Sequence, residues 1–170
     1  MLPELVLRRP RLVLLVLGIF CFASVGTAVV LGELFELEVC AMCWFQRIAF
    51  LLAGSGFLLA AAWPRASILT QRIGELGLLV GLASAARQVF LLYNPEAASG
   101  SCGAGLMYYL KMGYYEAFFR AGLVGGVECA ENQPLILGLR LPQWSLLAFC
   151  GIIALYAIWL FRKGRAGKPA

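Results

Sequence analysis

Two cysteines separated by two other residues, Cys40 and Cys43, form the motif with the clearest chemistry in this 170-residue sequence. Thiols at this spacing can form and break a disulfide, and one of them commonly ionises readily. A helix beginning at Cys43 would place unpaired N–H groups and the positive end of its dipole beside that sulfur. Arg47, four residues further on, would share its helical face. We therefore expect a stabilised Cys43 thiolate, although the spacing also fits an Arg47 that anchors the helix among lipid headgroups.

Four more cysteines widen the possible chemistry. Cys102 and Cys129 lie in a long polar segment, so closing that loop with a disulfide would restrict the unfolded chain by about 3 to 4 kcal/mol and would act as a staple. Cys21 and Cys150 fall inside apolar stretches, where a small buried apolar role is expected. Four thiolates can also hold zinc. Because Cys102 and Cys129 are not a second C-x-x-C and the chain has no His, we expect no metal site.

The elements that position these cysteines follow from composition. The chain is 62% apolar and only 14% charged, which favours lipid as its main solvent. Four apolar stretches of about 18 to 21 residues can each cross a hydrocarbon core of about 30 Å. We therefore predict one all-α membrane domain over 1–170, a four-helix bundle. Its expected segments are helices 12–31, 44–62, 73–93 and 144–161, outer loops 32–43 and 94–143, an inner loop 63–72 and an inner tail 162–170.

The first apolar stretch could end in a signal-peptidase site near Gly26-Thr27-Ala28. Its run of about twenty residues exceeds the usual length of about 7 to 15 for a signal-peptide core, so an uncleaved helix fits better.

The basic residues predict the orientation of the bundle. Most of them flank one set of helix ends: Arg8, Arg9, Arg11, Arg65, Arg72, Arg162, Lys163, Arg165 and Lys168. Only Lys111, Arg120 and Arg140 fall in the long loop on the other side. By the positive-inside rule both termini are cytoplasmic, and the four loop cysteines lie on the other side of the membrane, which in a bacterium is the oxidising periplasm. The pI near 9.0 then reports topology and attraction to anionic lipid, and no nucleic-acid groove is indicated.

Two further features concern the outer side. Tyr108, Met112, Tyr115 and Phe119 recur at helical spacing, which predicts a short helix lying in the membrane interface, with an irregular loop as the alternative. Arg87 is expected about 9 Å below the outer end of its helix, and Arg47 about 6 Å below the start of its own. Two guanidiniums at similar depth suggest an anionic or electron-rich group between them.

Several motifs in this order resemble one known family. They are Cys40-Ala-Met-Cys43-Trp44-Phe45-Gln46-Arg47, Ser84-Ala85-Ala86-Arg87, Cys129-Ala130-Glu131 and Pro142-Gln143-Trp144. Together with the second cysteine pair and the four helices, they resemble the disulfide bond formation protein B (DsbB) family over nearly the whole chain. The resemblance implies an inner-membrane thiol:quinone oxidoreductase that re-oxidises DsbA, a periplasmic thioredoxin-like oxidase.

The resemblance also implies roles for single residues. Cys102 would take the mixed disulfide with the soluble partner, and Cys129 would then attack Cys40. Cys43 would leave as a thiolate and donate electrons to ubiquinone or menaquinone, with Arg47 against the quinone ring. Arg87 is a further candidate for binding the quinone. Some family members carry a His just after the third helix that has been linked to the quinone, whereas this chain has Tyr93-Asn94-Pro95 there.

Two other functions stay open at this point. A conduit that carries electrons outward from a cytoplasmic thioredoxin would need cysteines within reach of both sides, and only Cys21 and Cys150 could serve. A membrane scaffold would use its disulfides only to hold its loops, and would then tolerate loss of Cys43.

Overall fold

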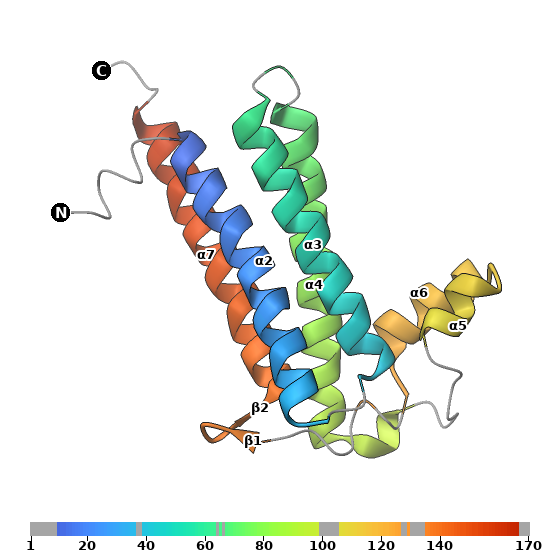
Figure 1. Ribbon diagram of the computed structural model, residues 1–170. Helices are drawn as coiled ribbons and strands as arrows, with labels where there is room; N and C mark the ends of the chain where they lie inside the picture. The colour runs from blue at the N-terminus through green and yellow to red at the C-terminus, as the bar shows by residue number, and fades with distance from the viewer. Residues whose placement is uncertain are drawn as a thin grey trace.

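Four long helices dominate the computed structural model, which describes residues 10–36, 39–63, 65, 67–98, 106–126, 129 and 135–166. They are α2 (Pro10–Leu34), α3 (Ala41–Ala62), α4 (Ser67–Tyr93) and α7 (Leu141–Ala166), drawn in Figure 1. Each contains a stretch long and apolar enough to cross a membrane: Arg11–Leu34, Ala41–Ala62, Ser67–Tyr93 and Leu141–Arg162. The predicted all-α four-helix membrane bundle is confirmed.

Helix α3 is the most buried of the four spanning helices, because it packs extensively on both α2 and α4, while α7 packs mainly on α4. Small residues allow the closest of these approaches. A Cβ atom on Gly56 of α3 would lie 2.6 Å from the backbone nitrogen of Gly74 on α4, and one on Gly77 would lie 2.9 Å from the backbone nitrogen of Ala53. The two backbones are thus in contact, and a larger residue at Gly56 would separate them.

Aromatic side chains fill the core where α7 joins the bundle. The rings of Phe50 and Phe149 stack with centroids 3.8 Å apart, and Phe57 lies 5.4 Å from Tyr156. The outward faces carry exposed apolar side chains such as Ile19, Leu76 and Leu155. A soluble protein would bury such faces, so the surface suits a lipid environment.

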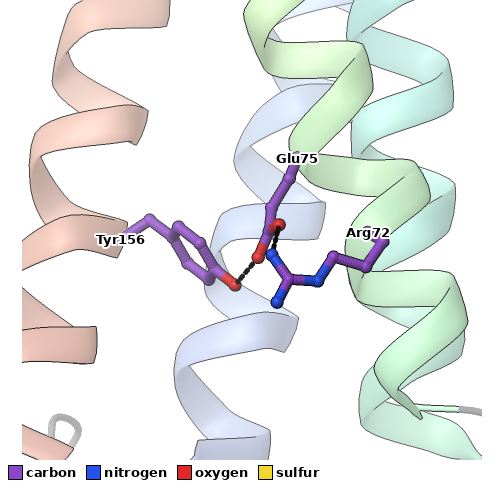
Figure 2. A network of polar contacts seen from close by, with 3 residues as sticks. All are labelled: Arg72, Glu75 and Tyr156. Carbon is purple, nitrogen blue, oxygen red and sulfur yellow. Dashed lines mark hydrogen bonds and ion pairs between the residues drawn. The ribbon is translucent and has the colours of Figure 1, made fainter. Parts of the chain in front are cut away.

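A charged network also links α4 to α7 (Figure 2). The carboxylate of Glu75 accepts a hydrogen bond of 2.6 Å from the Tyr156 hydroxyl and forms a 2.8 Å ion pair with Arg72. Glu75 is only 24% exposed, whereas Arg72 is 74% exposed. The network therefore lies at the surface of the bundle.

The two ends of the bundle differ in their connections. The start of α2, the end of α3, the start of α4 and the end of α7 lie at one end in Figure 1. Its described basic residues include Arg11, Arg65, Arg72 and Arg162, so we name it the basic end. The opposite end carries η2 (Pro95–Ala97), α5 (Leu106–Lys111), α6 (Tyr115–Val124), β1 (Leu135–Ile136) and β2 (Leu139–Arg140). We name this the loop end.

The single helix expected around Tyr108 to Phe119 is two helices, α5 and α6. The chain turns between them at Gly113, which has a φ of 75°. Glycine adopts this left-handed conformation without steric cost and commonly ends a helix in it. Phe118 and Gly122 of α6 pack on Phe45 of α3. Tyr115 and Phe119 are more than half exposed, although the Phe119 ring also lies edge-on to Phe45, so the segment presents an apolar outer surface.

A short antiparallel hairpin leads into α7. β1 and β2 pair Leu135 with Arg140, and both turn residues, Leu137 and Gly138, have positive φ angles. Gln143 accepts a hydrogen bond from the Arg140 backbone and donates one to the Tyr93 hydroxyl at the end of α4. These bonds fix the first turn of α7 against the loop end of α4.

Candidate functional site

The cysteine pair lies where α3 begins at the loop end. The helix starts at Ala41, two residues earlier than expected, so Cys40 is its N-cap and Cys43 lies in its first turn. The Cys40 sulfur accepts a hydrogen bond from the Cys43 backbone N–H at 3.4 Å, and the Cys40 thiol donates to the Cys43 sulfur at 3.1 Å. The two sulfurs are close enough to exchange between dithiol and disulfide with small side-chain rotations.

A third thiol completes the cluster. Cys129 is fully buried and packs with Cys40, Met42 and Leu91. A hydrogen bond between the Cys40 and Cys129 side chains, followed by the bond to Cys43 and by burial, raises the pKa of Cys40 well above the usual range of a thiol. Cys40 therefore stays protonated and donates its S–H, which leaves Cys43 as the sulfur better placed to carry negative charge.

Buried amides provide further hydrogen bonds to the pair. The Nε2 group of Gln88 on α4 lies 3.3 Å from the Cys43 sulfur and 3.4 Å from the Cys40 sulfur. Gln46 donates from its own Nε2 to the Gln88 Oε1 at 2.8 Å, and Ser145 of α7 donates to the Gln46 Oε1 at 2.6 Å. Three helices thus contribute to one chain of hydrogen bonds that ends on the sulfurs.

A pocket of about 310 Å³ adjoins the pair. It is mainly apolar, with a few polar side chains, and is formed by α2, α3, α7 and one residue of α4. The lining residues that matter here are Cys43, Arg47, Phe50, Gln88, Trp144 and Ser145. A mainly apolar cavity with a few convergent polar groups is typical of a small-molecule site.

Arg47 contributes the charged group of this pocket. Its guanidinium donates to the Ala28 carbonyl of α2 at 3.0 Å and lies 5.3 Å from the centroid of the Trp44 ring. It also lines a second, smaller pocket of about 180 Å³ together with Glu33 and Glu36. Arg47 thus stands between the apolar pocket and an acidic surface at the loop end.

Arg87 makes a different set of contacts from those expected. It is not among the residues that line the apolar pocket. Its guanidinium donates to the carbonyls of Val124, at the end of α6, and of Ala97, in η2, at 3.3 and 3.0 Å. Arg87 therefore connects two segments of the loop end. The sequence suggested an anionic or electron-rich group between Arg47 and Arg87, but the groups that Arg87 contacts are backbone carbonyls.

The remaining cysteines are separate from the cluster or outside the described residues. Cys102 falls outside them, so its position relative to Cys129 stays a prediction. Cys21 is fully buried in the main core, as expected, whereas Cys150 lies on an exposed face of α7. The expectation of burial was wrong for Cys150, because the apolar stretch that contains it faces lipid on that side.

The residues that sequence reasoning missed are Gln46, Gln88 and Ser145. Gln46 directly precedes Arg47, and Gln88 directly follows Arg87. Uncharged polar side chains at such depth in spanning helices are a signal in themselves, because they need hydrogen-bond partners inside the membrane. Within the described residues every buried side-chain nitrogen and oxygen has such a partner.

The place where some relatives carry a His has a structural role in this chain. The Tyr93 hydroxyl accepts a hydrogen bond from Gln143, and the Asn94 amide donates to the Phe90 carbonyl at 3.1 Å. Both residues thus secure the end of α4.

Comparison with known proteins agrees with this arrangement. The family model described as "Disulfide bond formation protein DsbB" matches residues 10–159. Disulfide bond formation protein B of Hahella chejuensis is 38% identical over 152 residues, covering 85% of this chain and 92% of that protein. Disulfide bond formation protein B 1 of Pseudomonas syringae pv. syringae is 33% identical over 168 residues, covering 97% and 96%. No solved structure matches the chain.

These matches extend over nearly the whole chain and include all four spanning helices. They indicate a multi-pass inner-membrane oxidoreductase that forms disulfide bonds. The chain belongs to the disulfide bond formation protein B (DsbB) family.

Proposed function

We propose that this protein re-oxidises a periplasmic thioredoxin-fold oxidase of the DsbA type and passes the electrons to a membrane quinone. The observation that carries this proposal is the position of Cys43, which belongs to the sulfur cluster and also lines the apolar pocket beside Arg47. One sulfur is thus within reach of protein thiols through Cys40 and of a lipid-soluble acceptor through the pocket.

The proposed order of thiol exchange begins at Cys102, and the cluster supports its later steps at Cys129, Cys40 and Cys43. A thiolate of the reduced partner attacks Cys102, so the mixed disulfide with Cys102 forms as the Cys102–Cys129 bond breaks and Cys129 leaves as a thiolate. Cys129, which hydrogen-bonds to Cys40, is placed to attack that sulfur rather than Cys43. The Cys40–Cys43 bond then opens, and Cys43 leaves as a thiolate that is stabilised by the hydrogen bond from Gln88.

The chemistry of the pocket fits a quinone. A quinone is a flat, largely apolar ring with carbonyl oxygens that accept hydrogen bonds, and when bound it supplies a two-electron acceptor. Phe50 and Trp144 provide aromatic walls, and Arg47 provides a cationic donor for a carbonyl oxygen. Arg47 would also stabilise the negative charge that develops on that oxygen. Ubiquinone and menaquinone both satisfy these requirements.

A quinone also meets the energetic demand of the reaction. A strongly oxidising DsbA-type partner is stabilised in its reduced form, so another protein disulfide re-oxidises it with little or no driving force. Electrons must therefore leave the pool of protein thiols, and a membrane-soluble acceptor removes them.

The proposed orientation places the loop end in the periplasm and both termini in the cytoplasm. The basic residues at the opposite end support it, because positively charged segments are retained on the cytoplasmic side. The exposed tyrosines and Phe119 of α5 and α6 suit the membrane interface on the periplasmic side. In this orientation the segments 32–43 and 94–143 are periplasmic, as the sequence suggested.

The test uses the purified full-length protein in lipid nanodiscs with a reduced DsbA-type oxidase and a short-chain ubiquinone. We expect quinone reduction, followed by its ultraviolet absorbance, to match the number of dithiols oxidised. Cys43→Ser should abolish quinone reduction and leave the helical circular dichroism unchanged. Full activity in Cys43→Ser would contradict the proposal and favour a scaffold whose disulfides only hold its loops.

A further inference from the structure

We infer that Gln88 stabilises the Cys43 thiolate directly, and that Gln46 and Ser145 are positioning residues that orient its amide. This inference deepens the proposed function and rests on it for the role of Cys43. In this chain a buried amide thus provides a neutral contact to the reacting sulfurs, at a site with no histidine.

The contacts of Gln88 single it out among the residues near the pair. Its side chain is fully buried, and its Nε2 group reaches both sulfurs of the C-x-x-C motif, at 3.3 and 3.4 Å. A buried N–H group that faces a sulfur gains most when that sulfur is ionised, because charge-assisted hydrogen bonds are stronger than neutral ones.

The direction of the Gln88 amide is set by its neighbours. An amide can turn over and exchange its oxygen for its nitrogen, and a carbonyl facing a thiolate would repel it. Gln46 prevents this exchange because its Nε2 donates to the Gln88 Oε1, which leaves the Gln88 Nε2 to face the sulfurs. Ser145 completes this arrangement by donating to the Gln46 Oε1.

The step that needs this contact is the opening of the Cys40–Cys43 disulfide. A Cys129 thiolate attacks the Cys40 sulfur, and the Cys129–Cys40 bond forms as the Cys40–Cys43 bond breaks. The electron pair of the broken bond leaves on Cys43 as a thiolate. One disulfide and one thiolate enter the step, and one of each leaves it, so electrons and charge balance. A hydrogen bond from Gln88 lowers the energy of the leaving thiolate.

The test measures the ionisation of Cys43 without quinone or a protein partner. In quinone-depleted Cys40→Ser protein, the rate at which iodoacetamide alkylates Cys43 is followed by peptide mass spectrometry over a range of pH. Adding Gln88→Met keeps a side chain of similar size and removes the donor. We expect the midpoint of the pH profile to rise by about one to two pH units, as loss of a hydrogen bond to a charged group predicts.

Two further variants in the same background complete the design. Gln46→Met leaves Gln88 in place but removes the group that orients it, so a smaller rise in the midpoint is expected. Gln71→Met makes the same change on α4, near the opposite end of the helix, and should leave the midpoint unchanged. Circular dichroism reports whether each variant keeps its helices.

An unchanged midpoint in folded Gln88→Met protein overturns the inference. If Gln88→Met does not fold, an unchanged midpoint in Gln46→Met overturns it instead. The alkylation assay contains no quinone, so its result does not depend on whether the protein transfers electrons to a quinone. The role of Gln88 and the proposed function can therefore be disproved separately.

Discussion

Helix α4 contributes to two polar networks that both reach α7, one at each end of the bundle. At the loop end, Gln88 connects through Gln46 to Ser145 and touches the two sulfurs. At the basic end, Glu75 connects to Tyr156 and Arg72 (Figure 2). The first network is built from neutral groups and is buried, whereas the second contains a carboxylate whose cationic partner is mostly in solvent.

The difference follows from where charge is needed. A permanent carboxylate is tolerated at the basic end because Arg72 forms an ion pair with it at the surface of the bundle. The loop-end network surrounds a group that we propose is charged only during part of a catalytic cycle. Neutral amide donors can stabilise such a charge without themselves paying the large desolvation cost of a buried ion. We therefore expect changes at the loop end to alter reaction rates and changes at the basic end to alter stability.

The largest effect is expected for Cys43→Ser. Removing the sulfur that faces both the cluster and the pocket should lower dithiol-dependent quinone reduction by about a thousandfold or more. Initial rates with the DsbA-type partner measure this effect. Tyr156→Phe is the matched change at the basic end, and a comparable loss of rate in that variant would break the comparison between the two ends.

A second large effect is expected for Arg47→Met. Arg47 is the cationic group of the apolar pocket, so its loss should lower the rate about a hundredfold, as loss of a donor to developing oxyanion charge does elsewhere. Steady-state kinetics with quinone as the varied substrate would separate binding from turnover. Arg47→Lys keeps the charge and should recover part of the rate, whereas wild-type kinetics in Arg47→Met would remove Arg47 from the site.

Arg87→Met should have a smaller and different effect. Since Arg87 bonds the carbonyls of Val124 and Ala97, its loss should loosen the loop end and slow oxidation of the protein partner about tenfold. The KM for quinone should stay unchanged when a small dithiol replaces the protein partner. An increase in that KM similar to the effect of Arg47→Met would restore Arg87 as a quinone-binding residue.

The smallest effect on activity is expected for Tyr156→Phe. The variant loses one hydrogen bond to a partly buried carboxylate, which should lower the free energy of unfolding by about 1 to 2 kcal/mol. Unfolding in mixed detergent micelles, followed by circular dichroism, measures this change. Quinone reduction at a temperature where both proteins are folded should be the same, and unaltered stability would show that Glu75 finds another partner.

The parts of this molecule that sequence predicted well depend on local patterns. Four apolar stretches gave four helices, because length and hydropathy alone decide whether a helix can span a membrane. The position of Cys43 in a first helical turn followed from the boundary between loop and apolar run. The break between α5 and α6 also had a local signal, the glycine at position 113. The helical spacing of Tyr108 and Phe119 nevertheless predicted a single helix.

The amide network could not be predicted in the same way. Gln46 and Gln88 are 42 positions apart, and Gln46 and Ser145 are 99 apart, so only the packing of three helices brings them together. Arg87 shows the same limit, because its distance from the end of its helix could be estimated from the sequence but said nothing about the loop carbonyls that it meets. The prediction that Cys150 is buried was wrong for a related reason, since an apolar stretch does not reveal which of its faces meets lipid.

The central claim is that the Cys43 thiolate lies against a quinone in the pocket beside Arg47. The most direct measurement is the visible absorbance of Cys40→Ser protein, reconstituted with quinone whose presence is verified by extraction and mass analysis. We predict a charge-transfer band that fades as the pH falls and the thiolate is protonated, and that is lost in the Cys43→Ser variant. A quinone-loaded Cys40→Ser protein with no visible band at any pH would contradict the claim.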